Sequence, residues 1–187
     1  HVALIWEGDE PGEDKKITYL ELKNEVCRLA NALKSLNVKR GDRVIIYMPL
    51  VPEAVYAMLA CARLGAVHSV VFGGFAATEL ATRIDDAKPK LILSASCGLE
   101  PGRIVRYKPL LDEAIKLASH KPDACLILQR PQDEAALVSG RDHDHPRQLV
   151  YRDGVPSEAV VNEGNCFLDR ELVFRPVLQD AVDAEAH

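Results

Sequence analysis

The chain has 187 residues, 48% of them hydrophobic, so it is long enough to bury the core of one ordinary domain and of a second small one. Its 23 basic and 28 acidic residues give a formal net charge of −5, which argues against a strongly basic nucleic-acid binder and against a polybasic membrane surface. No apolar run approaches the roughly 18–20 residues that a membrane-spanning helix needs. Because the sequence begins with His1 and has no apolar signal segment, we expect a fragment of a longer protein or a chain trimmed at its start.

The first 35 residues predict a strand, a loop and an amphipathic helix. Residues 2–6 favour a short strand, and the polar stretch 7–16 favours a loop. Thr18 followed by Glu21 forms a capping box, in which the hydroxyl and the carboxylate satisfy free N–H groups at a helix start. Apolar residues then recur at spacings of three and four as far as Leu33, which predicts a helix with one buried stripe.

The next part of the chain alternates between continuous apolar runs and helical patterns. The apolar runs predict buried strands at residues 44–48, 66–72, 91–93 and 124–128. The helical patterns predict helices at residues 52–64, 76–86 and 110–119. Pro52 and Gly65 suit the two ends of the first of these helices. The alternation indicates βαβ units, so the sequence predicts a layered α/β fold with a parallel sheet that helices cover on both faces.

The pattern weakens from about residue 129. Residues 140–147 are charged and predict a loop, and residues 149–187 contain short apolar runs without a clear period. We therefore expect residues 149–187 to form either an irregular cover or a disordered tail.

Cysteines and histidines form no recognisable redox or metal motif. The five cysteines are widely spaced, which favours reduced, structural thiols in an intracellular compartment. His68 lies within an apolar strand and is predicted to be a buried, hydrogen-bonded structural residue rather than a catalytic one. The run Asp142, His143, Asp144 and His145 lacks the ligand spacing of a known metal site, so we predict no metal site there.

Two loops at the carboxyl ends of predicted strands carry the strongest signal for a ligand, because open parallel sheets bind ligands at that edge. The first holds Phe72, Gly73 and Gly74 before a helix, and paired glycines let the backbone approach a ligand closely and expose N–H groups. The second, residues 94–103, is rich in small residues and ends in Arg103, which can hold a phosphate through two parallel hydrogen bonds. If the two strands are neighbours, both loops border one site for a phosphate-containing ligand. Ordinary turns with a surface arginine are the alternative interpretation.

Long ungapped stretches of the chain resemble the AMP-forming short-chain acyl-CoA synthetases, a family that includes acetyl- and propionyl-CoA synthetases. These stretches are residues 17–19, 33–42 and 46–74. Further stretches are similar to the propionyl type, at residues 96–103, 107–114 and 120–122. The resemblance covers about residues 1–144 and implies the N-terminal part of the adenylate-forming domain. It therefore divides the chain into a partial AMP-binding domain at residues 1–144 and a divergent, poorly ordered tail at residues 145–187. The family activates a carboxylic acid, here propionate or acetate, with ATP to an acyl-adenylate and pyrophosphate. It then transfers the acyl group to the thiol of coenzyme A.

The resemblance also implies a coenzyme A site. In the acetyl-CoA synthetase branch the two loops hold the adenine and 3′-phosphate end of coenzyme A. Carried over to this chain, the residues are Phe72, Gly73, Gly74, Glu100, Pro101, Gly102 and Arg103. This chain has Glu100 where acetyl-type enzymes have an arginine, so Arg103 or Arg106 must carry more of the charge pairing.

The remaining expectations concern the complete enzyme. The resemblance implies ATP, coenzyme A and Mg²⁺ as cofactors, small molecules as partners, and the mitochondrial matrix as location, with the cytoplasm as the alternative. The family's phosphate loop and its catalytic lysine do not occur in these 187 residues. We therefore expect the ATP and Mg²⁺ sites to lie outside this chain and the chain alone to be inactive. A non-catalytic short isoform that binds a nucleotide, coenzyme A or a partner is the alternative. The preferred acid and the oligomeric state are left open.

Overall fold

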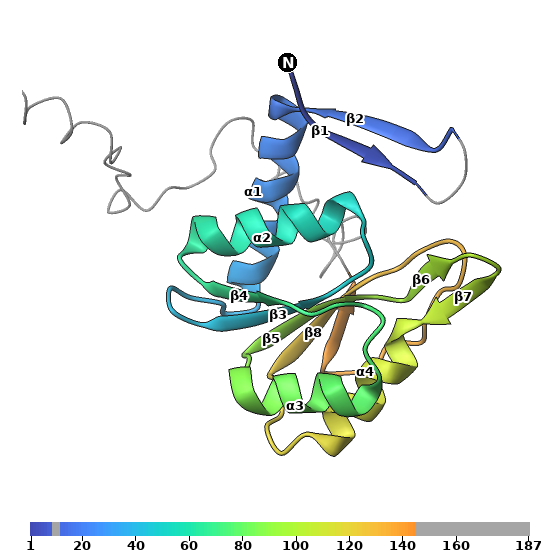
Figure 1. Ribbon diagram of the computed structural model, residues 1–187. Helices are drawn as coiled ribbons and strands as arrows, with labels where there is room; N and C mark the ends of the chain where they lie inside the picture. The colour runs from blue at the N-terminus through green and yellow to red at the C-terminus, as the bar shows by residue number, and fades with distance from the viewer. Residues whose placement is uncertain (9–11, 145–187) are drawn as a thin grey trace, which may run out of the picture.

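A parallel sheet lies at the centre of the computed structural model, which describes residues 1–8 and 12–144 (Figure 1). Its strands are β3 (Arg43–Tyr47), β4 (Val67–Val70), β5 (Leu91–Ala95), β8 (Ala124–Leu128) and β9 (Asp142–Asp144). They pair in the order β4-β3-β5-β8-β9, and every neighbouring pair is parallel. The connection from β4 to β5 therefore crosses β3, which lies between them in the sheet.

Two helices cover each face of this sheet. They are α1 (Tyr19–Ser35) and α2 (Pro52–Leu64) on one face, and α3 (Ala77–Ala87) and α4 (Tyr107–Leu117) on the other (Figure 1). The predicted capping box is confirmed: Thr18 Oγ1 accepts from the N–H of Glu21 at 3.3 Å, and the Glu21 carboxylate accepts from the N–H of Thr18 at 2.8 Å. Gly65 ends α2 with φ 70°, a conformation that costs glycine little. The predicted layered α/β fold is confirmed.

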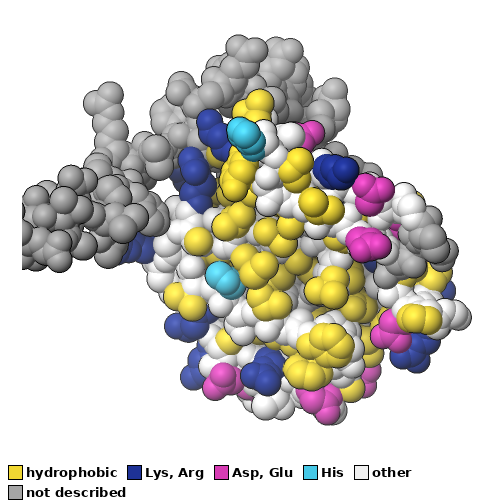
Figure 2. Space-filling model, turned by 45° about the horizontal axis from the view of Figure 1, so that its top comes forward, with side chains coloured by type: hydrophobic (Ala, Val, Ile, Leu, Met, Phe, Trp, Pro, Cys, Tyr) yellow, Lys and Arg dark blue, Asp and Glu magenta, His cyan; other side chains and the backbone are white. Residues whose placement is uncertain are grey.

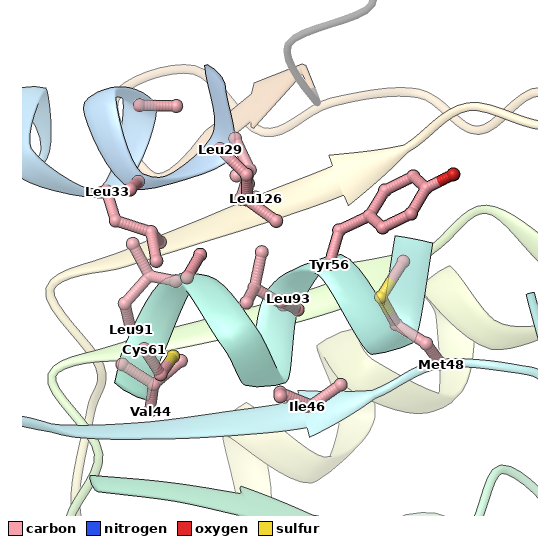
Figure 3. Close-up of a cluster of buried hydrophobic side chains, with 14 of the residues drawn as sticks. Leu29, Leu33, Val44, Ile46, Met48, Tyr56, Cys61, Leu91, Leu93 and Leu126 are labelled. Atoms are coloured by element: carbon pink, nitrogen blue, oxygen red, sulfur yellow. The ribbon is translucent and has the colours of Figure 1, made fainter. Parts of the chain in front are cut away.

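The strands send alternate side chains to the two faces of the sheet, as a pleated strand must. In β3, Val44 and Ile46 join the core under α1 and α2, whereas Ile45 and Tyr47 join the core under α3 and α4. Figure 3 shows the first core, where leucines of α1 lie over the sheet. Because Leu126 in this core is fully buried, its truncation to alanine would cost about 2–5 kcal/mol.

The expectation of a buried strand at residues 66–72 is wrong. Strand β4 spans four residues, all of them exposed, with Val67 at 58% and Val70 at 56%. His68 is therefore exposed and not a buried structural residue. Among the described residues β4 pairs only with β3, so one side of it is an open sheet edge. A β-branched run predicts a strand but not the strand's position in the sheet.

The described N-terminal residues form a second, antiparallel element. Strands β1 (Val2–Glu7) and β2 (Asp14–Thr18) pair as a hairpin, and Trp6 Nε1 donates to the backbone oxygen of Leu50 at 2.8 Å. The expectation of a loop at residues 7–16 is wrong at residues 14–16, which belong to β2. The exposed lysines of this strand conceal the alternation that would have indicated it.

Three other differences from the sequence prediction involve three or more residues. Two further strands, β6 (Cys97–Glu100) and β7 (Arg103–Arg106), form an antiparallel hairpin where a loop was expected. Helix α4 begins at Tyr107, three residues earlier than predicted, because Pro109 is tolerated in a first turn. The charged loop expected at residues 140–147 contains strand β9. The predicted tail, residues 145–187, lies outside the described residues.

Figure 2 shows hydrophobic side chains gathered over one face of the molecule. The described helices include none that is both long enough and apolar enough to cross a membrane.

Candidate functional site

The first predicted loop, residues 71–76, leaves β4 and leads into α3; we call it the glycine loop. The N–H of Phe75 donates to the backbone oxygen of Phe72 at 3.1 Å, which closes a turn around the two glycines. The rings of Phe72 and Phe75 meet edge to face, with centroids 5.9 Å apart. Gly73 is buried and Gly74 is exposed. Phe72 is 70% exposed, so the loop offers an uncovered aromatic ring.

The second predicted loop is the turn of the β6–β7 hairpin. Pro101 and Gly102 connect the strands. Gly102 adopts φ 77°, a conformation that costs glycine little, and Pro101 before it has a fixed φ that suits a turn. Glu100 and Arg103 are paired across the two strands next to this turn. Glu100 Oε2 accepts from Arg103 Nη2 at 2.6 Å and from Arg103 Nε at 2.8 Å. The turn therefore presents an arginine that is already bound to a carboxylate.

The glycine loop and the β6–β7 hairpin border one cavity of about 570 Å³. The lining residues are Gly73, Gly74, Phe75, Ala76, Glu100, Arg103, Ile104, Val105, Arg106, Pro109 and Leu110. Four of the seven predicted site residues are among them, namely Gly73, Gly74, Glu100 and Arg103. Phe72, Pro101 and Gly102 lie next to these residues in the chain but do not line the cavity.

The condition on which the shared site was predicted does not hold, because β4 and β5 are not neighbours. Strand β3 lies between them. The glycine loop lies against Tyr47, the last residue of β3. Tyr47 Oη donates to the backbone oxygen of Phe75 at 3.1 Å, and the oxygen of Gly73 lies 3.4 Å away.

Two tyrosines that the sequence pattern did not indicate lie beneath the cavity. Tyr107, the first residue of α4, stacks on Tyr47 with centroids 5.1 Å apart and an interplanar angle of 25°. A Cβ atom at Gly73 would lie 2.0 Å from Tyr107 Oη, and one at Gly98 would lie 2.9 Å from Tyr107 Cε1. Tyr47 and Tyr107 both lie within stretches that resemble the family, but the resemblance does not reveal that the Tyr107 ring lies against two glycine backbones.

Both arginines of the cavity are exposed and paired with carboxylates. The side chains of Arg103 and Arg106 are 71% and 70% exposed, and Arg106 Nε lies 3.1 Å from Asp133 Oδ2. Exposed ion pairs of this kind contribute about 0–1 kcal/mol. Because these ion pairs are weak, a phosphate dianion that binds the same guanidinium can displace the carboxylate.

A second cluster of charges anchors the helix that follows the hairpin. Lys108 Nζ, on a buried side chain, lies 2.6 Å from Asp112 Oδ2 and 2.9 Å from Asp142 Oδ2. Arg141 pairs with both aspartates, and the N–H of Val138 donates to Asp142 at 2.7 Å. Burial acts to raise the pKa of Asp142, but the hydrogen bonds from Arg141, Lys108 and Val138 outweigh it and hold this pKa below its usual range. The cluster ties α4 to β9.

The Asp-His-Asp-His run is thus part of a strand and an ion-pair cluster, as far as Asp144. His145 lies outside the described residues. Within residues 1–8 and 12–144, no three histidine, cysteine or acidic side chains are grouped so that they could hold a metal ion.

The fold belongs to the class of α/β proteins with an open parallel sheet between layers of helices. The sequence model of the AMP-binding enzyme family matches residues 1–166. The chain therefore belongs to the AMP-binding enzyme family.

Several curated relatives are similar to this chain. It is 61% identical over 142 residues to uncharacterized protein PA3568 of Pseudomonas aeruginosa, covering 76% of this chain and 23% of that protein. It is 52% identical over 152 residues to the mitochondrial acyl-CoA synthetase short-chain family member 3 of Rattus norvegicus, covering 80% and 22%. It is 48% identical over 170 residues to acetyl-coenzyme A synthetase of Methylorubrum extorquens, covering 89% and 26%.

A solved structure agrees with these relatives. Acetoacetyl-CoA synthetase from Streptomyces lividans superposes with a TM-score of 0.65 at 27% identity, covering 77% of this chain and 22% of that one. The resemblance to AMP-forming acyl-CoA synthetases is confirmed. The chain spans about a quarter of the length of the relatives it matches.

Proposed function

We propose that this chain is part of an AMP-forming acyl-CoA synthetase that acts on a short-chain acid such as propionate or acetate. In that reaction the carboxylate attacks the α-phosphorus of ATP and releases pyrophosphate. The thiol of coenzyme A then attacks the acyl carbon and releases AMP. The names of the relatives support this activity for the longer protein, which would use ATP, Mg²⁺ and coenzyme A.

The described residues would contribute part of the coenzyme A site. The proposed site consists of Phe72, Gly73, Gly74, Glu100, Pro101, Gly102 and Arg103, with Arg106 beside them. A guanidinium fork suits a phosphate, and an exposed aromatic ring suits an adenine base. The residues present therefore fit the nucleotide end of coenzyme A.

One observation carries this proposal: the glycine loop and the Glu100–Arg103 turn, which are separate in sequence, border the same cavity. Ordinary turns at opposite ends of the sheet would not share a cavity. The cavity opens beyond the carboxyl ends of the parallel strands, which is where such sheets bind ligands.

Calorimetry with the 187-residue chain tests the site. We expect coenzyme A to bind, and dephospho-coenzyme A, which lacks the 3′-phosphate, to bind more weakly. Hydrogen bonds to charged groups contribute about 1.5–3 kcal/mol. Arg103→Ala should therefore weaken coenzyme A binding about tenfold or more and remove most of the preference for the 3′-phosphate.

Arg28→Ala is the matched control. Arg28 also pairs with a glutamate three residues away, Glu25, at 2.7 Å, but it lies on α1. This variant should bind coenzyme A like the parent chain. Absence of binding by the parent chain, or equal losses in both variants, would refute the proposed site.

The activity itself requires the longer protein. The reading frame beyond His187 should encode a Thr/Ser/Gly-rich loop that ends in Pro-Lys-Gly, and the product of that frame should release pyrophosphate from ATP only when an acid is supplied. A stop codon after His187, with a stable short product, would favour a non-catalytic binding module instead. A location in the mitochondrial matrix rests on the relatives named mitochondrial, and cell fractionation tests it.

A further inference from the structure

Two buried tyrosines lie against the segments that line the cavity but do not line it themselves. Tyr47 is 0% exposed and Tyr107 is 7% exposed, and their rings are stacked. Tyr47 ends the central strand β3, and Tyr107 begins α4 directly after β7. The pair therefore joins the sheet to the helix that follows the hairpin.

Each tyrosine holds a different part of the site. Tyr47 donates its hydroxyl hydrogen to the glycine loop, at the backbone oxygen of Phe75. Tyr107 packs against the backbone at Gly73 and at Gly98, so closely that a Cβ atom at either position would overlap its ring. Gly73 belongs to the glycine loop and Gly98 to strand β6. The ring of Tyr107 thus determines how closely the glycine loop and strand β6 approach each other.

We propose that Tyr47 and Tyr107 are positioning residues that hold the glycine loop and the β6–β7 hairpin at the separation that coenzyme A requires. This inference rests on the proposed function of the cavity. It adds that the affinity for the nucleotide end depends on two side chains that lie beneath the cavity wall.

The protonation state of Tyr47 is consistent with this role. Burial, with a smaller contribution from Tyr107, raises the pKa of Tyr47 to about 12. Its hydroxyl is therefore protonated at neutral pH and can donate to the loop throughout the physiological range.

Three substitutions in the 187-residue chain separate the two contributions. Tyr47→Phe keeps the stacked ring and removes the hydroxyl, and we expect coenzyme A to bind about three- to tenfold more weakly. Tyr107→Leu removes the ring between the two walls, and we expect a loss of more than tenfold. Tyr107→Phe keeps the ring, and we expect an affinity within about twofold of the parent chain.

Tyr56→Phe is the matched control, because Tyr56 is another buried tyrosine but lies on α2, on the opposite face of the sheet. It should leave the affinity for coenzyme A unchanged. Urea unfolding of every variant shows which of them are folded under the binding conditions. Hydrogen exchange at the amide of Phe75 should increase in Tyr47→Phe, whereas a merely structural role of Tyr47 would raise exchange throughout the sheet.

Gly73→Ala provides a second, independent test. Alone it should weaken binding, because its Cβ would overlap Tyr107. In the Tyr107→Leu background the same change should cost much less, so the two effects should be non-additive. Additive effects would show that Gly73 and Tyr107 act separately and would overturn the inference.

The outcomes distinguish this inference from the proposed function. If the parent chain binds coenzyme A and Tyr47→Phe and Tyr107→Leu bind it equally well while folded, the tyrosines do not position the site. If the parent chain binds neither coenzyme A nor adenosine 3′,5′-bisphosphate, the proposed coenzyme A site fails and the inference fails with it.

Discussion

Replacement of Glu100 by glutamine should strengthen coenzyme A binding. The Glu100 carboxylate is 2.6 Å from Arg103 Nη2, so a bound phosphate must displace it. That exposed pair contributes about 0–1 kcal/mol. The displaced carboxylate would also repel the phosphate. At about 6 Å, a unit charge and a dianion repel each other by about 1.4 kcal/mol in water, and physiological salt roughly halves this.

Together these terms amount to about 0.7–1.7 kcal/mol, which corresponds to a gain of about three- to eighteenfold in affinity for Glu100→Gln. Calorimetry with coenzyme A at low and high ionic strength measures this gain, and it should shrink as salt rises. Dephospho-coenzyme A should show little gain. Glu25→Gln, which removes the matched carboxylate beside Arg28, should change neither affinity.

An equal gain for dephospho-coenzyme A would refute the reasoning, because the effect would not then involve the 3′-phosphate. Weaker binding by Glu100→Gln would also refute it. That result would mean that the Glu100–Arg103 pair orients the arginine for the ligand rather than competing with the ligand.

Three further predictions concern the scaffold. Asp142→Asn removes one of the two carboxylates at the buried Lys108, which keeps Asp112 at 2.6 Å, and should destabilise the chain by about 1.5–3 kcal/mol in urea unfolding. Because the pKa of Asp142 lies below its unfolded value, its contribution is present above about pH 4 and is lost as pH falls through the folded pKa, so acid should destabilise the parent chain more than this variant. Thr18→Ala removes the cap of α1 and should cost about 1 kcal/mol, which thermal unfolding measures; an unchanged midpoint would contradict the capping argument. Val67→Lys with Val70→Lys adds charge to the exposed edge strand β4 and should reduce self-association in sedimentation, whereas a parent chain that is already monodisperse would remove the reason for the change.

Local chemistry made part of this fold predictable. The Thr18–Glu21 box and the Pro52 and Gly65 ends of α2 were found because each feature depends on residues a few positions apart. The buried strands β3, β5 and β8 were found because strands covered on both faces consist of continuous apolar runs.

Features that depend on distant partners were not predictable. The valines of residues 66–72 suggested a buried strand, and only the sheet order places Val67, His68 and Val70 of β4 at the edge. The β6–β7 hairpin escaped notice because its small residues suggested a loop. The candidate site was located from its glycines and arginine, but the supporting Tyr47–Tyr107 pair depends on a contact between residues 60 positions apart.

The close contact of one ring with two glycines couples three positions of this chain. While Tyr107 is present, a methyl group at Gly73 or Gly98 would overlap its ring. A smaller side chain at position 107 would remove that overlap at both glycines. A substitution at either glycine should therefore be tolerated only together with one at Tyr107, although the three residues lie in a loop, a strand and a helix.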